Sequence, residues 1–250
     1  EEGEGKKITA QEFEKIAQEE FDYFKSQDAT YNCKVHIRDD VNIMMVSYGE
    51  LYLPSDYTMT PKDARALTQH ELGTHALTYY NGKQQSLSQM SVGFADYDTM
   101  QEGLAVLAEY FCGALSANRL RILAGRVVAG KALIDGANFK YMFNMLFSQH
   151  GFTKERAFNI TSRMFQGGGF LKDVVYLKGL VQLRDYFQNG GDLKNLLAGK
   201  FALKHVDIIN DLTERKLLKL PVLTPRYLNT ETFQNKMDAV RNGIALSKMI

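Results

Sequence analysis

Residues 69–75 read QHELGTH, with His70 and His75 five positions apart and Glu71 directly after the first histidine. In the common zinc-peptidase signature two histidines stand four apart on one helix face, with a glutamate after the first. On a regular α-helix, side chains five apart point about 140° away from each other and cannot bind one small ion. A π-bulge would bring such positions over each other, and Gly73 supplies backbone tolerance for it. Two interpretations stay open: a metal site on a widened turn, or histidines on different helix faces.

A catalytic zinc ion needs a third protein ligand and an open position for water. The stretch 96–110, DYDTMQEGLAVLAEY, offers four carboxylates, Asp96, Asp98, Glu102 and Glu109. We select Glu102, because a loop and the start of an antiparallel helix fit before it and Gly103 would let the two backbones approach closely. The alternative is that Thr99 and Glu102 form a capping box. Glu109, on the same helix face, either orients a ligating imidazole or is a solvated surface charge.

The motif lies in the middle of a predicted helix over 61–81, which starts with a proline in its first turn and ends at Asn81-Gly82. Residues 33–39 and 41–55 are rich in β-branched and aromatic side chains and predict two or three short strands. Apolar residues at helical spacing predict further helices over 9–24, 99–117, 119–134, 138–149, 153–165, 171–188, 192–198, 203–218 and 231–248. A small sheet followed by many helices predicts an α+β, mainly helical architecture.

Length, composition and net charge limit the number of domains and the classes of binding partner. The 250 residues, 45% of them hydrophobic, predict a single domain over residues 9–250 after a flexible, charged segment over 1–8. The net charge of +1, from 30 basic and 29 acidic residues, predicts no nucleic-acid or membrane partner. No apolar run reaches the ~18 residues of a membrane helix, and no signal peptide is evident, so a cytoplasmic location is the default expectation.

The glycine-rich segment 163–179, RMFQGGGFLKDVVYLKG, lacks the spacing of a phosphate-binding loop, and no strand precedes it. The glycine run centred on Gly168 leads into a helix whose free N–H groups suit an anion. With Arg163 before it and Lys172 after it, this helix end is a candidate site for a peptide's terminal carboxylate. The alternative is a tight turn between helices, with Arg163 paired to a neighbouring acid.

Tyr176 and Arg226 are two further candidate substrate-binding residues. Tyr176, one turn after Lys172, would stabilise an oxyanion or line a pocket, although most tyrosines at such spacing are core residues. Arg226, in the segment PRYL, would close over the site. The sequence does not decide between these roles and ordinary packing.

The segments HELGTH, YYNG, QEGLAVLAEY, GGGFLKDVVYLKG and PRYL closely resemble the family named for its QEGLA motif. Its bacterial members have been labelled modulators of flavohaemoglobin expression, and its animal members include the microtubule-associated tyrosine carboxypeptidases. The family carries HExxxH, the same one-residue surplus as this chain. The resemblance implies a zincin-like metallopeptidase fold in which His70, His75 and Glu102 bind zinc and Glu71 is the catalytic base.

Two departures limit what the resemblance implies. Leu171 stands where the family often has a threonine, and nothing here corresponds to the extensions that place animal members on microtubules. Tubulin as a substrate therefore does not carry over.

The predicted function is a Zn²⁺-dependent metallopeptidase, which the resemblance makes a carboxypeptidase that removes one C-terminal residue, with an aromatic residue as a candidate. Its partner would be a peptide or protein C-terminus, and its oligomeric state is not predicted. Two alternatives stay open: a non-catalytic regulatory or interaction module of the same fold, and a zinc hydrolase that acts on small amides.

Overall fold

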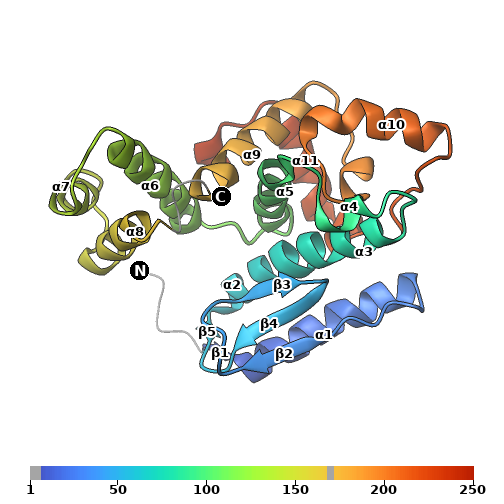
Figure 1. The fold of residues 1–250 in the computed structure, drawn as a ribbon, viewed down its shortest axis with the longest axis horizontal. Coiled ribbons are helices and arrows are strands. Elements are labelled where there is room, and N and C mark those ends of the chain that lie inside the picture. The colour runs from blue at the N-terminus through green and yellow to red at the C-terminus, as the bar shows by residue number, and fades with distance from the viewer. Residues whose placement is uncertain (1–6, 168–171) are drawn as a thin grey trace.

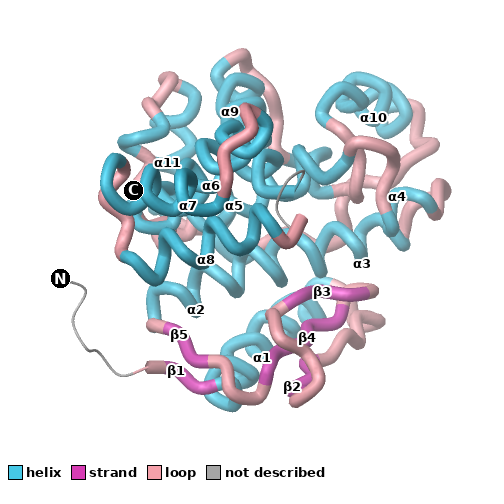
Figure 2. The backbone as a smooth tube through the Cα atoms, turned by 60° about the vertical axis from the view of Figure 1, so that its left-hand side comes forward, coloured by secondary structure: helices cyan, strands magenta, loops and turns pink. Residues whose placement is uncertain are grey.

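The three-dimensional structure is a computed structural model that describes residues 7–167 and 172–250. All of its described strands lie between Ile8 and Met59, and helices dominate the rest of the chain (Figure 1). Figure 2 shows the strands gathered on one side of the molecule, next to α1 and below most of the other helices. The predicted α+β, mainly helical architecture with a small sheet before the motif helix is confirmed.

Helix α1 (Ala10–Gln27) begins at a capping box. Thr9 Oγ1 accepts a hydrogen bond from the backbone N–H of Glu12 at 3.3 Å, and Glu12 Oε2 accepts one from the N–H of Thr9 at 2.9 Å. Its apolar side, which includes Phe13 and Phe21, is buried. The helix therefore forms where the 3.6-residue pattern predicted it.

Five short strands make two small sheets. Strand β2 (Val35–Arg38) is parallel to the central strand β4 (Glu50–Pro54), and β3 (Met45–Ser47) pairs antiparallel with the other edge of β4. These three strands confirm the two or three that the sequence predicts. Strand β1 (Ile8–Thr9) pairs antiparallel with β5 (Thr58–Met59), just ahead of the motif helix.

One continuous helix carries the motif. It consists of α2 (Pro61–Leu67), a π-helix (Thr68–Ala76) and α3 (Leu77–Lys83). Thr60 caps its start, because Thr60 Oγ1 accepts from the N–H of Asp63 at 3.1 Å. The sheet and α1 contact this helix from below in Figure 1, and α5 contacts it from above. The QHELGTH motif thus lies between the sheet and α1 on one side and α5 on the other.

The predicted helix end at Asn81-Gly82 is wrong, because α3 continues through both residues. Asn81 is fully buried, and its amide donates to the carbonyls of Leu197 and Leu223 at 2.9 Å each, while its Oδ1 accepts from the N–H of Leu223 at 2.8 Å. A Cβ on Gly82 would overlap the backbone of Met90. These two residues pack later segments onto the motif helix instead of forming a turn.

Helices α5 (Tyr97–Phe111) and α9 (Lys172–Gln188) cross at two glycines. A Cβ on Gly103 would overlap the backbone of Gly179, and a Cβ on Gly179 would overlap the carbonyl oxygen of Thr99. The expectation that Gly103 lets α5 approach the motif helix is wrong, because its close neighbour is α9. Backbone contact at this crossing positions the two helices that flank the candidate site.

Helices α6 (Ala117–Ile134), α7 (Phe139–Asn144) and α8 (Lys154–Phe165) enclose a hydrophobic cluster of their own, separate from the larger core. Figure 1 shows these three helices beside the main body. The prediction of a single domain over residues 9–250 stays a prediction. Most of the predicted flexible segment over 1–8 lies outside the described residues, but its last residue, Ile8, is paired in β1.

The other described helical elements lie outside the motif helix. They are α4 (Gln89–Val92), a π-helix (Met145–Gln149), α10 (Val206–Glu214), α11 (Glu231–Arg241) and 3-10 turns at Lys194–Leu197, Leu203–His205, Arg226–Asn229 and Leu246–Lys248. Helices α5 and α11 end earlier than predicted, because Gly113 (φ 74°) and Gly243 (φ 75°) adopt the left-handed conformation that terminates a helix. None of the helices in the described parts of the chain is long and apolar enough to cross a membrane.

Candidate metal centre

A widened helical turn brings the two histidines of the motif together. Thr68–Ala76 is a π-helix, and the backbone N–H of Leu77 donates to the carbonyl of Leu72, five residues earlier. The ring centroids of His70 and His75 are 5.1 Å apart, with their planes at 78°. The π-bulge prediction is confirmed, and the alternative that the histidines lie on different helix faces is wrong.

Gly73 serves this turn by its size. A Cβ on Gly73 would overlap Oε1 of Gln69, a buried side chain whose Nε2 donates to Glu20 at 3.3 Å. Gly73 does not have a positive φ. The expectation that it supplies an unusual backbone conformation is therefore wrong. The hydroxyl of Thr74 donates to the carbonyl of Gln69 at 3.0 Å and satisfies one acceptor of the wide turn.

Glu102, on α5, meets both histidines. The helix begins at Tyr97 with Asp96 as its N-cap residue, so Thr99 and Glu102 lie inside it and the capping-box interpretation is wrong. Glu102 Oε2 lies 3.5 Å from Nε2 of His70 and 3.5 Å from Nε2 of His75.

The spacing of these three donor atoms fits a tetrahedral metal ion. Nitrogen and oxygen ligands at ~2.0–2.1 Å from a zinc ion stand ~3.3–3.4 Å from each other at tetrahedral angles. A separation of 3.5 Å is too long for a strong hydrogen bond, and Glu102 Oε2 is buried without a hydrogen-bond partner among the described residues. His70, His75 and Glu102 are also the one group in the described chain whose ligand atoms all lie within 4.8 Å of one another. Two imidazoles and a carboxylate are a donor set of catalytic zinc sites.

The two carboxylates next to His70 act on its pKa. Burial alone would lower the pKa of His70, but the nearby carboxylate of Glu102 and the hydrogen-bonded carboxylate of Glu109 outweigh burial and raise this pKa to about 10. Burial alone would raise the pKa of Glu102, but the imidazoles of His75 and His70 hold it well below its usual range. A metal ion that bound here at neutral pH would therefore displace a proton from His70.

Glu109 orients His70. Nδ1 of His70 lies 2.8 Å from Oε1 of the buried Glu109, and Nη2 of Arg119 donates to the same oxygen at 3.2 Å. With Nδ1–H donating to Glu109, Nε2 of His70 faces Glu102 and is available as a ligand atom. Burial would raise the pKa of Glu109, but Arg119 and His70 lower it, so the carboxylate stays charged. The interpretation of Glu109 as a solvated surface charge is wrong.

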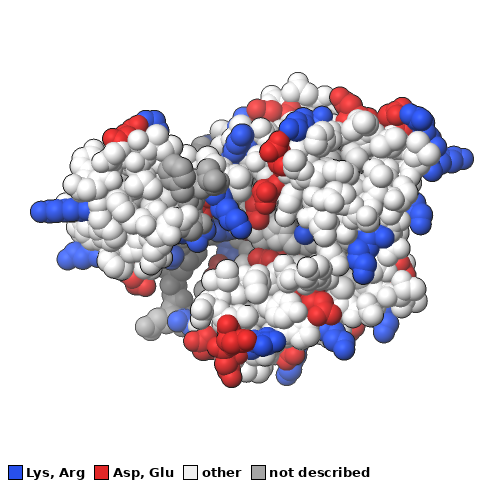
Figure 3. Space-filling model, in the orientation of Figure 1, with Lys and Arg blue, Asp and Glu red and all other residues white. Residues whose placement is uncertain are grey.

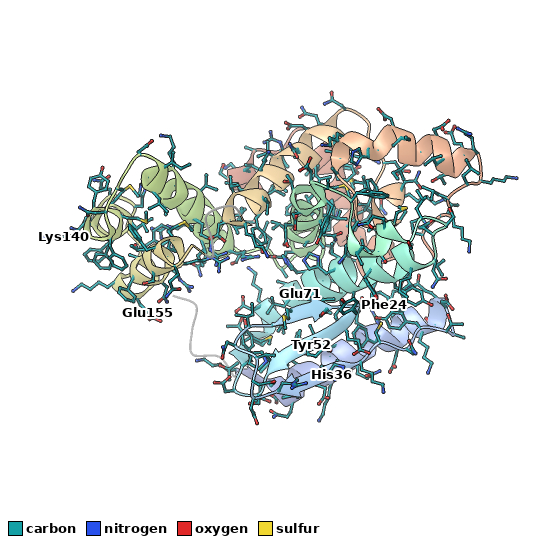
Figure 4. All side chains as sticks on the ribbon, viewed as in Figure 1. Phe24, His36, Tyr52, Glu71, Lys140 and Glu155 are labelled. Atoms are coloured by element: carbon teal, nitrogen blue, oxygen red, sulfur yellow. The ribbon has the colours of Figure 1, made fainter. Side chains whose placement is uncertain are left out.

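Glu71 and His70 line the same hollow, which has a volume of about 460 Å³. Figure 4 shows Glu71 between the sheet and the helices above it. Apolar side chains from the β3–α2 region form part of the wall, namely Met44, Tyr57, Met59 and Leu67. The space-filling view is hollowed at its centre, and acidic and basic side chains border the depression (Figure 3).

Tyr176, on α9, borders both this hollow and a second one. Its ring is stacked on His70 with centroids 6.3 Å apart, and the Arg119 guanidinium lies 5.8 Å from its ring centroid. The second hollow, of about 1090 Å³, is bordered by Tyr176, Glu102 and Lys172. Burial and the charge of Glu102 raise the pKa of the Tyr176 hydroxyl, so this hydroxyl stays protonated and can donate a hydrogen bond.

The candidate carboxylate site around the glycine-rich segment is not assembled as expected. Nε of Arg163 donates to both oxygens of the buried Asp173, at 3.0 and 2.7 Å, which is the alternative pairing with a neighbouring acid. Arg163 borders the hollow of Glu71, whereas Lys172 borders the second hollow. The structure does not bring these two side chains to one point, and Gly168 lies outside the described residues.

Arg226 does not border either hollow. Its Nε donates to Oε2 of Glu20 at 3.1 Å, its Nη2 donates to the carbonyl of Glu19 at 2.9 Å, and its guanidinium lies 4.5 Å from the ring centroid of Tyr23. The expectation that Arg226 closes over the site is wrong, because the buried carboxylate of Glu20 binds it to α1.

Sequence reasoning missed Arg119, Arg126 and Asp173. Arg119 and Arg126 stand seven positions apart, which places them on one face of α6. This spacing is the sequence feature from which a shared role of the two arginines could have been predicted. Their direction towards the motif helix depends on how α6 packs, which one sequence does not reveal.

Comparison with known families gives one assignment. Residues 1–245 match the family described as microtubule-associated tyrosine carboxypeptidase. A search of curated proteins finds no match. Because the match covers nearly the whole chain, this chain belongs to that family, and the resemblance inferred from its motifs is confirmed.

Proposed function

We propose that this family member is a zinc-dependent carboxypeptidase with a single zincin-like catalytic domain over residues 9–250. The observation that carries the proposal is the position of Glu102 Oε2, buried, without a hydrogen-bond partner among the described residues, and 3.5 Å from Nε2 of both His70 and His75. These three side chains would hold the Zn²⁺ ion. The family description supports removal of a single residue from a peptide or protein C-terminus.

Glu71 is the proposed general base. When bound, zinc supplies a Lewis acid for the scissile carbonyl and for the attacking water. Glu71, directly after His70 and in the same hollow, takes the proton from that water and delivers it to the leaving amine. Glu109 keeps the ring of His70 in the orientation that this chemistry needs.

The residues around the hollow suit an apolar terminal side chain. Tyr57, Met59 and Leu67 offer contact to a large apolar or aromatic group next to Glu71. The protonated hydroxyl of Tyr176 donates to the scissile carbonyl oxygen as negative charge develops there. Lys172, in the second hollow, contacts the part of the substrate that precedes the scissile bond.

Zinc binding is expected to release about one proton at pH 7.5, because the pKa of His70 is raised to about 10 in the metal-free protein. Zinc affinity then rises about tenfold per pH unit over the range in which His70 is protonated. In the metal-free protein this raised pKa stabilises the fold fully below ~6.5, and the contribution is lost as the pH rises through about 10. Calorimetric titrations in buffers of different ionisation enthalpy measure the released proton, and zinc binding without proton release contradicts the assignment.

The Glu109→Gln variant is expected to bind zinc about 10–100-fold more weakly than the wild type, because the amide still accepts from His70 but carries no charge. A competitive titration with a zinc chelator measures this affinity. Glu20→Gln is the matched control, since Glu20 is also buried and hydrogen-bonded but contacts Gln69 and Arg226 instead of the imidazoles. Equal losses in both variants would mean that Glu109 acts only on general stability.

The function itself is tested by incubating the zinc-loaded protein with a mixed peptide library and reading the product masses. Loss of one residue from the C-terminus is the expected result. Internal cleavage products contradict the carboxypeptidase proposal. An intact library alongside hydrolysis of small amides favours the small-amide hydrolase, and a folded protein that binds no zinc favours the non-catalytic module.

A further inference from the structure

Three arginines border the hollow beside the metal group, Arg119 and Arg126 from α6 and Arg163 from α8. Two of them are engaged by buried carboxylates. Arg119 donates to Glu109 at 3.2 Å, and Arg163 donates to both oxygens of Asp173. Three guanidinium groups thus share two buried carboxylate partners, Glu109 and Asp173.

Arg126 is the arginine without a carboxylate of its own. Its one hydrogen bond among the described residues runs from Nη1 to Oδ1 of Asp173 at 3.3 Å, on an oxygen that already accepts from Arg163. Nε of Arg126 is buried without a hydrogen-bond partner in the described chain. Burial lowers the pKa of Arg126, Asp173 partly offsets this, and the cations Arg163 and Arg119 lower it further. A partly buried guanidinium with an unpaired donor gains stability from a bound anion.

An anion bound by Arg126 would lie in the same hollow as Tyr176, His70 and Glu71. Arg119 and Arg126 both act electrostatically on Tyr176, whose ring is stacked on His70. Arg126 follows Arg119 by two helical turns, about 10 Å along the same face of α6. His70, Glu71, Tyr176 and Arg126 all border this one hollow.

We infer that Arg126 binds the free α-carboxylate of the substrate's last residue and thereby restricts the enzyme to C-terminal cleavage. The inference rests on the proposed function and names the residue that decides its substrate class. A guanidinium fork matches the two oxygens of a carboxylate. Arg163 and Asp173 position Arg126, and the apolar wall of the hollow receives the terminal side chain. An amidated terminus lacks the charge and brings N–H donors against the guanidinium, so it is rejected.

Binding to an inactive background tests the inference separately from catalysis. Two fluorescein-labelled pentapeptides ending in phenylalanine, one with a free carboxylate and one amidated, are titrated against zinc-loaded Glu71→Gln protein by fluorescence polarisation. The free carboxylate should be preferred about tenfold to a hundredfold. Adding Arg126→Gln should abolish the preference, and adding Arg126→Lys, which keeps the charge without the fork, should reduce it at least threefold. Adding Arg156→Gln, an exposed arginine on α8, should leave it unchanged.

The outcomes separate two kinds of failure. A preference that survives in both Arg126 variants overturns the inference, while C-terminal trimming by the wild type would still support the proposed function. Absence of any trimming by the wild type overturns the proposed function itself. If Arg126→Gln does not fold, as thermal unfolding reports, the Arg126→Lys result decides alone.

Steady-state kinetics give an independent readout in the Glu71-containing enzyme. Loss of the carboxylate contact should raise KM for free-carboxylate peptides about tenfold or more in Arg126→Gln. The ratio of kcat/KM for free-carboxylate peptides to kcat/KM for amidated peptides should fall accordingly. Equal losses on both substrates would indicate a structural role for Arg126 and overturn the inference.

Discussion

The Glu71→Gln variant is expected to lose roughly 10²–10⁴-fold in kcat/KM on a cleavable peptide while it folds and binds zinc as the wild type does. The amide has nearly the same shape as the carboxylate but cannot accept the proton from water. Glu71 is not one of the three side chains that meet at the metal group, so zinc content should not change. Mass-spectrometric rates of C-terminal trimming, together with zinc content per protein chain, measure both parts of the prediction.

Glu155→Gln provides the matched control for this variant. The same chemical change is made on an exposed side chain of α8, far from Glu71 (Figure 4). Its activity should equal that of the wild type. If Glu71→Gln is as active as Glu155→Gln, Glu71 is not the base and the proposed proton transfer is wrong.

The Gly179→Ala variant is expected to lose about 3 kcal/mol of unfolding free energy, because the new Cβ would overlap backbone atoms of Thr99 and Gly103. Backbone cannot rotate away as a side chain can, so α5 and α9 have to separate. This loss corresponds to a decrease in Tm of about 6–12 °C for a chain of this size. Zinc affinity should fall as well, since Glu102 and Tyr176 lie within one turn of this crossing on α5 and α9.

Gly130→Ala is the matched control for the crossing. Gly130 is also inside a helix, α6, but nothing lies within 4 Å of a Cβ placed there. Alanine at this position should stabilise the protein by roughly 0.5–1 kcal/mol. Urea unfolding of the metal-free proteins compares the two variants. A Gly179→Ala protein as stable as Gly130→Ala would show that the helices do not depend on this close approach.

Much of the fold was predictable from local sequence. The apolar spacing after Thr9, the proline at the start of the motif helix and the β-branched runs before it each encode an element through its neighbours along the chain. Asn81 and Gly82 were misinterpreted, because their turn-like chemistry is used to hold Leu197, Leu223 and Met90 from distant parts of the chain. Such partners are visible only once the helices pack.

The candidate metal-binding group of His70, His75 and Glu102 was predictable, because the spacing of its ligands is also a local feature of the sequence. The one-residue surplus between His70 and His75 demands a wide turn, and a carboxylate on the next long helix is the nearest way to complete the group. The residues beyond it were less predictable. Arg226 is drawn to Glu20 on α1, and Arg126 is directed into the hollow by the packing of α6 against α9. Long cationic side chains reach in several directions, so their spacing along the chain does not decide their partners.

Anomalous diffraction at the zinc absorption edge, from crystals of the zinc-loaded protein, tests the central claim most directly. The account predicts one strong peak about 2.0–2.2 Å from Nε2 of His70, Nε2 of His75 and a carboxylate oxygen of Glu102. A zinc-loaded protein whose peak lies elsewhere, or that shows no peak between these three side chains, would contradict it.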